Sequence, residues 1–186
     1  MTYAPTVSAT VRALHRSSEY TFAKEACPSL DLIAGIGVDG DVHAGAAVRH
    51  RSRVERDPSQ PNLRQVHLFD GELLDMLASE GFDLSPGVLG ENVTTSGLDA
   101  LSLPTGTLLR IGADALLALT GVRNPCVQIE ARFPGLLKRM VHRDDEGELV
   151  RLTGAMAVVV QAGTIHEGDR IAVQLPPGTP QILQLV

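Results

Sequence analysis

A chain of 186 residues with 44% apolar side chains can bury a core of its own, which excludes a disordered protein and one that needs disulfides to fold. Aromatic residues make up only 3% of it and the net charge is −6, which argues against a nucleic-acid partner. Residues 1–10 lack the basic and apolar segments of a signal peptide, and no apolar run reaches the roughly 20 residues that span a bilayer, so we expect a cytoplasmic protein with no membrane partner.

The first half of the chain predicts two strands, a glycine-rich turn and a helix. Residues 6–14 and 63–69 alternate apolar and polar side chains, the pattern of a strand with one buried face. Between them, residues 34–45 contain four glycines, a density typical of a tight backbone that can approach a ligand closely. Asp70 is a suitable N-cap for a short helix over 71–80.

The remainder predicts short strands separated by loops and turns. We expect irregular loops over 17–30 and 85–97, and two short helices over 126–131 and 135–141. The expected strands cover residues 107–111, 115–120, 155–160 and 170–175, with a turn at Gly168-Asp169 before the last. Many short strands at this spacing favour a single domain over 1–186 that is mainly β, a closed or nearly closed barrel with few helices.

Cys126 is the first candidate for chemistry. It follows Pro125, whose φ is fixed, and Arg123 lies three residues earlier. If Cys126 opens a helix, backbone N–H groups and the guanidinium favour the thiolate, which suits nucleophilic attack, sulfur carriage or binding of a soft metal. The alternative is a buried structural cysteine, and both interpretations stay open. Cys27 has no electropositive neighbour in the sequence and is expected to be structural.

A basic run in this acidic chain is the second candidate. Arg49, Arg51, Arg53 and Arg56 fall within eight residues. In an extended backbone the first three project to one side, where guanidinium groups hold phosphate or carboxylate bidentately. A solvated loop paired with nearby acids is the alternative interpretation.

Two polar pairs in glycine-rich loops are further candidates. The doublet Asp41 and His43 can bind a metal, with His50 and His67 as additional ligands, but an aspartate that caps turn amides fits the pattern equally. Glu91, next to Asn92, can be an acid or base, or can bond turn amides instead.

Taken together, these runs resemble the MOSC domain, the family named for the C-terminal domain of molybdenum cofactor sulfurases. The resemblance covers roughly residues 35–173. It rests on Gly40-Asp41-Val42-His43-Ala44-Gly45, Arg64-Gln65-Val66-His67-Leu68, Gly90-Glu91-Asn92-Val93, Leu101, Gly106, Arg123-Asn124-Pro125-Cys126, Gly154, and Gly163 with Gly168-Asp169.

The resemblance implies a mixed β-barrel with few helices and a cysteine, here Cys126, that ligates molybdenum or carries sulfur. Stand-alone bacterial members are thought to bind a molybdopterin cofactor and to reduce N-hydroxylated bases. Cys126 would then be the catalytic metal ligand, with the arginine run as a cradle for the cofactor phosphate. The implied cofactor-binding residues are Asp41, His43, Arg49, Arg51, Arg53, Arg56, Arg64, Glu91, Asn92, Arg123 and Asn124.

Three functions therefore stay open: a molybdenum-dependent reductase of N–O bonds, a sulfur carrier or transferase with a persulfide on Cys126, and a non-catalytic module that binds a pterin or other anion. The chain has no cysteine-rich iron–sulfur motif and no clear dinucleotide-binding fingerprint. We therefore expect a small-molecule substrate and, as partner, a separate electron-donor protein or a cysteine desulfurase.

Overall fold

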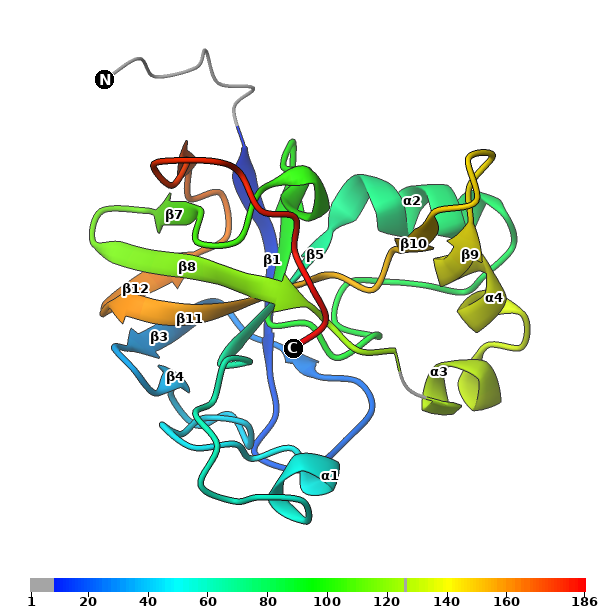
Figure 1. Ribbon diagram of the computed structural model, residues 1–186. Helices are drawn as coiled ribbons and strands as arrows, with labels where there is room; N and C mark the ends of the chain where they lie inside the picture. The colour runs from blue at the N-terminus through cyan, green and yellow to red at the C-terminus, as the bar shows by residue number, and fades with distance from the viewer. Residues whose placement is uncertain (1–8, 126) are drawn as a thin grey trace.

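The structure is a computed structural model, and it describes residues 9–125 and 127–186. Its main element is an eight-stranded sheet (Figure 1). The strand order is β13 (Ile171–Gln174), β7 (Leu108–Ile111), β8 (Ala115–Val122), β11 (Ala155–Gln161), β5 (Val66–Asp70), β6 (Val93–Ser96), β1 (Thr10–Arg16) and β2 (Glu25–Ala26).

Two smaller sheets accompany it. One has three strands in the order β12 (Gly163–His166), β3 (Ser29–Ile33) and β4 (Gly37–Val38). The other pairs β10 (Leu149–Arg151) with β9 (Val141–Arg143). The helices are short: α1 (Arg51–Val54), α2 (Gly71–Ser79), the 3₁₀ turn η1 (Ala100–Ser102), α3 (Val127–Arg132) and α4 (Leu136–Met140). No helix among the described residues is long and apolar enough to cross a membrane.

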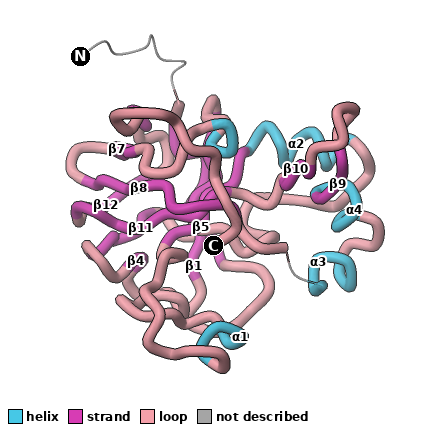
Figure 2. The backbone as a smooth tube through the Cα atoms, viewed as in Figure 1, coloured by secondary structure: helices cyan, strands magenta, loops and turns pink. Residues whose placement is uncertain are grey.

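Three of the described helices lie together on one side of the main sheet. Figure 2 shows α2, α3 and α4 gathered beside the main sheet near β9 and β10, whereas α1 lies apart from them. The last residues of the chain run along β8, because Val122 donates its N–H to the Gln184 carbonyl (2.8 Å) and accepts from the Val186 N–H (3.3 Å). The motif residues Gln65 and Asn92 directly precede β5 and β6, and Arg123 directly follows β8.

Two apolar cores form on the two sides of β5. Val66 and Leu68 belong to the core between the strands. Phe69, on the opposite side, packs into the second core with residues of α2, α3 and α4 such as Leu74, Ile129 and Leu136. Because side chains alternate along a strand, His67 projects to the same side as Phe69.

Helix α2, the helix that the sequence predicted, links β5 to β6, and these two strands pair in parallel. Asp70 caps it by accepting hydrogen bonds from the N–H groups of Glu72 (2.9 Å) and Leu73 (3.4 Å). The expected helix over 71–80 is confirmed within one residue, and the expected strands over 115–120 and 155–160 correspond to β8 and β11.

The prediction of a mainly β fold with few short helices is confirmed, but the closed barrel is not. The main sheet is open, with β13 at one end of its order and β2 at the other. A single antiparallel bridge between Thr10 and Arg170 brings β1 near the start of β13 without a continuous ladder.

Local expectations were wrong in three places. The loop predicted over 85–97 contains β6, whose residues Thr94 and Thr95 are fully buried although they are polar. The irregular stretch predicted over 17–30 contains β2 and the start of β3. Residues 51–54 form one turn of helix, so the extended backbone that would put Arg49, Arg51 and Arg53 on one side is not formed. Each element is only two to five residues long, too short for a period to emerge from the sequence.

Candidate functional site

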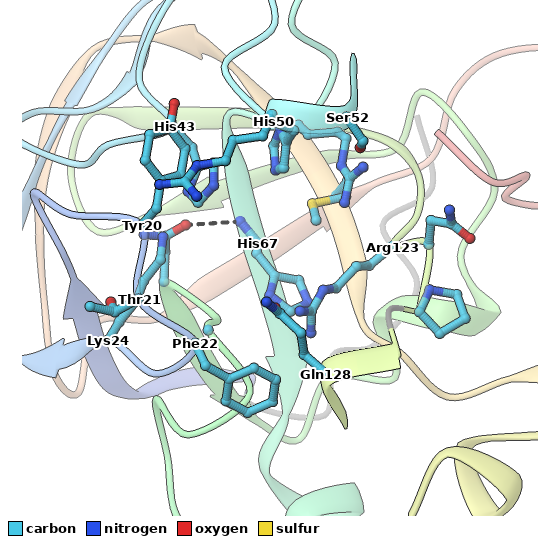
Figure 3. A pocket seen from close by; sticks show the side chains of 17 residues that line it. Tyr20, Thr21, Phe22, Lys24, His43, His50, Ser52, His67, Arg123 and Gln128 are labelled. Atoms are coloured by element: carbon cyan, nitrogen blue, oxygen red, sulfur yellow. Dashed lines mark hydrogen bonds between the residues drawn. The ribbon is translucent and has the colours of Figure 1, made fainter. Parts of the chain in front are cut away.

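A pocket of about 380 Å³ lies where the polar motifs meet (Figure 3). Its walls come from distant parts of the chain, between Tyr20 and Met156. The lining residues are Tyr20, Thr21, Phe22, Lys24, His43, His50, Arg51, Ser52, Arg64, His67, Gly90, Asn92, Arg123, Asn124, Pro125, Gln128 and Met156.

The pocket is cationic although the protein as a whole is acidic. Lys24, Arg51, Arg64 and Arg123 line it, and no aspartate or glutamate is among the described lining residues. Since the whole chain carries a net charge of −6, this concentration of positive charge is local. Such a site favours an anion, and arginine in particular suits phosphate or carboxylate groups.

Lys24 is a nearly enclosed cation of this pocket. Its side chain is 5% exposed, and its Nζ lies 2.5 Å from Oδ2 of Asp41, whose side chain is 2% exposed. Burial lowers the pKa of Lys24, and the charge and hydrogen bond of Asp41 oppose that shift. Although burial alone would raise the pKa of Asp41, its hydrogen bonds and the Lys24 charge keep that pKa far below its usual value, so the carboxylate stays ionised.

Asn92 connects this pair to the strands. Its Nδ2 donates to Oδ2 of Asp41 (2.9 Å) and to the His15 carbonyl (3.1 Å), and its Oδ1 accepts from the His67 N–H (3.2 Å). Both donors and the acceptor of this buried amide are thereby used, so Asn92 fixes the loop after Gly90 against β1 and β5.

His67 forms the floor of the pocket as a neutral imidazole. It is buried, and its Nε2 lies 3.1 Å from the Thr153 carbonyl oxygen, to which Nε2 donates when it carries the proton. Burial and then the charge of Arg123 lower its pKa well below the ordinary value. In Figure 3 the side chain of Arg123 extends toward that of His67.

A stack of rings forms another wall. His43 and His50 stack with centroids 4.3 Å apart, and Tyr20 meets His43 edge-on at 5.6 Å. The guanidinium of Arg51 lies 4.6 Å above the Tyr20 ring. Burial and neighbouring positive charges lower the pKa of His50 to about 2, so the His50 ring in this wall is neutral.

The segment that leads from β8 to α3 borders the pocket on the opposite side. Arg123 is anchored at its backbone by Thr153, whose Oγ1 donates to the Arg123 carbonyl (2.5 Å), and its Nη1 donates to the Leu89 carbonyl (2.7 Å). Asn124, Pro125 and Gln128 also line the pocket. Cys126, the first candidate of the sequence, lies outside the described residues.

The structure brings together six of the residues that the resemblance implicates. His43, Arg51, Arg64, Asn92, Arg123 and Asn124 line the pocket. Arg49, Arg53 and Arg56 are not among its lining residues, because the run turns into α1 instead of extending. In a helix, successive side chains rotate by about 100°, so side chains two positions apart diverge rather than share a face.

Glu91 and Asp41 have structural partners instead of facing the pocket. Glu91 is fully buried, and its Oε1 accepts from the Gly87 N–H (2.6 Å) and the Thr94 hydroxyl (3.2 Å), which favours the turn-bonding interpretation. Burial raises the pKa of Glu91. Residues 9–125 and 127–186 contain no group of three or more His, Cys, Asp or Glu side chains arranged to hold a metal, so the proposed set around Asp41 and His43 is not formed.

Several pocket residues escaped the sequence analysis. Tyr20, Lys24, Gln128 and Met156 stand outside every glycine-punctuated motif. The one available signal was composition: Lys24 is one of two lysines in the chain, and it precedes a strand in a stretch that lacks any period. The pairing of β11 with β5 places Met156 opposite His67, and Tyr20 and Lys24 follow β1, which pairs with β6.

Comparison with known proteins gives a family match and a curated relative. A family model described as the MOSC domain matches residues 39–172. Over 141 residues the chain is 28% identical to a protein named "Reductase" from Gibberella moniliformis (strain M3125 / FGSC 7600), an alignment that covers 73% of this chain and 22% of that protein. The chain thus spans about a fifth of the length of that relative.

Solved structures share the fold. YuaD from Bacillus subtilis superposes with a TM-score of 0.70 at 24% identity, covering 90% of this chain and 96% of that one. YiiM from Escherichia coli gives 0.59 at 18% identity, covering 94% and 72%. YiiM from Geobacillus stearothermophilus gives 0.61 at 16% identity, covering 89% and 75%.

Proposed function

The chain belongs to the MOSC domain family, and on this premise we propose that it binds a molybdenum–pterin cofactor and reduces the N–O bond of N-hydroxylated bases. The observation that carries the proposal is the cationic pocket bordered by Arg123, Asn124 and Pro125, the residues that lead directly to Cys126. The name of the fungal relative, "Reductase", agrees with this reaction class.

The pocket fits such a cofactor in size and charge. Ligand pockets for small molecules occupy about 300–1,000 Å³, and this one measures about 380 Å³. The pterin carries an anionic phosphate, and the described lining offers four cationic side chains and no carboxylate. The lining therefore already carries the positive charge that attracts a phosphate group.

Each group has an expected role toward the cofactor. Arg51, Arg64 and Arg123 would hold its anionic part, and the thiolate of Cys126 would be the soft ligand to molybdenum. When bound, the metal would supply the two-electron redox chemistry of the reduction. The protein's own part is to bind and orient, with neutral His67 and His50 adding no further charge to the pocket.

The net reaction defines what else is required. An N-hydroxylated base takes up two electrons and two protons, its N–O bond breaks, and the amine and one water result. The electrons come from a separate one-electron donor, for which reduced methyl viologen is a suitable laboratory substitute.

The test is metal analysis of protein made in a host that synthesises the cofactor. We expect about one molybdenum per wild-type chain and loss of most of it in Cys126→Ala, because a thiolate ligand is removed. The same preparations are assayed for reduction of an N-hydroxylated purine by reduced methyl viologen, with the amine product measured.

Cys27→Ala is the matched control. Cys27 is half-buried against the core between the strands and does not line the pocket, so this variant is expected to keep both metal and activity. Equal molybdenum in wild type and Cys126→Ala would refute the ligand assignment. Wild-type protein without molybdenum, but with a persulfide on Cys126 after treatment with a cysteine desulfurase, would instead favour the sulfur carrier.

A further inference from the structure

Lys24, which lines the pocket, forms a buried ion pair with Asp41. The two side chains are 5% and 2% exposed, and their charged atoms lie 2.5 Å apart. Removing two charges from water costs about as much as their attraction returns, so such a pair is weak grounds for a stabilising role. Of the two residues Lys24 alone lines the pocket among those described, and this position points to a role there.

Asp41 is held rigidly by hydrogen bonds, two of them from the pocket residues His43 and Asn92. Its Oδ1 accepts from the His43 N–H (3.0 Å) and lies 3.3 Å from Nδ1 of the same residue. Its Oδ2 accepts from Nδ2 of Asn92 (2.9 Å) and from the Ser17 N–H (3.4 Å). Contacts from three segments therefore fix the direction in which this carboxylate presents Oδ2 to Lys24.

Lys24 has donors left over. An ammonium group carries three N–H donors, and Asp41 is the one hydrogen-bond partner of Nζ among the residues that the structure describes. Because the side chain is nearly inaccessible yet lines the pocket, the remaining donors are available to a bound molecule rather than to bulk solvent.

We propose that Asp41 is a positioning residue for Lys24, and that the Lys24 ammonium binds the oxygen that leaves the substrate and gives it a proton as the N–O bond breaks. This inference rests on the proposed reduction of N-hydroxylated bases. The proton moves from Nζ to the departing hydroxyl oxygen, which leaves as water. The electron donor supplies two electrons, solvent supplies the second proton to nitrogen, and the neutral amine of Lys24 is reprotonated from water.

The electrostatics of the pair suit a proton donor. Burial lowers the pKa of Lys24 and so makes it a better acid than an exposed lysine, while Asp41 keeps it protonated. The titratable and charged groups whose fields act on Lys24, or on which it acts, are Asp41, Glu91, Arg123, His15, His50 and His67. Loss of the Asp41 charge leaves burial and Arg123 to lower the Lys24 pKa further.

The first test measures this coupling without cofactor. Lys24 and Lys138 are the two lysines of the chain, so protein labelled with ¹³C at the lysine ε-carbon gives two lysine signals to titrate. We expect the Lys24 midpoint to fall by at least about one pH unit in Asp41→Asn, because a buried opposite charge is lost. Lys138 is exposed and serves as the internal control. An unchanged Lys24 midpoint would overturn the positioning role.

The second test uses molybdenum-loaded protein. Lys24→Met alone would leave the buried Asp41 carboxylate without its counter-ion. This variant is therefore compared with the double variant Lys24→Met/Asp41→Asn, in which both charges of the pair are removed. We expect the double variant to keep its metal and its KM while kcat falls roughly 10²-fold or more. Wild-type kcat, or loss of molybdenum in place of loss of turnover, would overturn the proton-donor role. Lys138→Met should be unaffected.

The pH profile separates positioning from simple folding defects. The acid must be protonated, so kcat should fall as pH rises through the Lys24 pKa, and in Asp41→Asn this fall should move to lower pH. If the wild type carries molybdenum but reduces no N–O bond, the proposed function fails and the proton-donor role fails with it. The lysine titration would still decide whether Asp41 controls Lys24.

Discussion

At the scale of single residues, Gly154 shows how the pocket floor depends on the absence of a side chain. It has a φ of +83°, and a Cβ placed there would lie 2.5 Å from Nε2 of His67 and 2.6 Å from the Leu68 carbonyl oxygen. The glycine therefore meets two requirements at once: a left-handed backbone and close approach of the chain to β5.

A matched pair of substitutions separates these requirements. Gly147 has the same φ of +83°, but a Cβ at that position would meet nothing within 4 Å, so Gly147→Ala should cost only the backbone strain, about 1 kcal/mol. Gly154→Ala adds a clash with backbone and should lower the free energy of unfolding by about 3 kcal/mol. Urea denaturation of both variants measures the difference, and equal losses would contradict the steric argument.

The sequence predicted some residues of the site and not others for a physical reason. His43, Asn92 and Arg123 stand in glycine- or proline-marked loops, where a local pattern signals a special backbone. Lys24 directly precedes β2, which pairs with β1, and β1 also pairs with β6, a strand far away in the sequence that no local pattern encodes. Cys126 remains a prediction, since it lies outside the described residues.

At the scale of elements, the contribution of the Asp70 cap to the stability of the protein can be measured. Asp70 accepts two backbone N–H groups, and Ala at this position should cost about 1 kcal/mol, whereas Asn should preserve the cap. Thermal or urea unfolding of Asp70→Ala and Asp70→Asn at pH 5 measures this. If both variants lost equal stability, the capping role would be wrong.

The pH dependence of the same cap has a definite sign. Burial and the neighbouring Glu72 raise the pKa of Asp70 to about 7, above its unfolded value, so the folded protein binds this proton more tightly. Stability should therefore fall as pH rises from the unfolded pKa of about 4 toward 7, and Asp70→Asn should remove that part of the fall. Although burial opposes it, hydrogen bonding lowers the Glu72 pKa to about 2, which places its contribution below this window.

Elements differed in how well the sequence encoded them. The helix over 71–80 and the strands of 115–120 and 155–160 were predictable because each presents a cap or a full apolar period. α1 has no buried residue and its N-cap makes no side-chain hydrogen bond, so nothing in its sequence marks a helix. β6 was hard to predict because two of its three buried residues, Thr94 and Thr95, are threonines.

At the scale of the molecule, positive charge is concentrated in the pocket of a chain whose net charge is −6. Inorganic phosphate should therefore bind and stabilise the folded protein, by about 1.4 kcal/mol at ten times its dissociation constant, with the gain shrinking at high ionic strength.

Two arginines of α1 allow a test of whether phosphate binds in the pocket. Arg51 lines the pocket and Arg53 does not, so Arg51→Gln should abolish most of the phosphate-dependent rise in Tm whereas Arg53→Gln should retain it. Both variants change the net charge equally, which controls for the overall field. A similar loss in both would mean that phosphate responds to the field of the whole protein rather than to the pocket.

The residues of the pocket wall lie between positions 20 and 156, and this separation in sequence affects the order in which parts of the protein fold. Chain segments so distant in sequence meet late, because closing long loops costs entropy before any contact compensates for it. Local units such as α2 with its flanking strands can form early, but the anion site exists only once the N-terminal strand has found its partners. Ligand affinity is thus a property of the completely folded chain, and its recovery after dilution from denaturant marks the last step of folding.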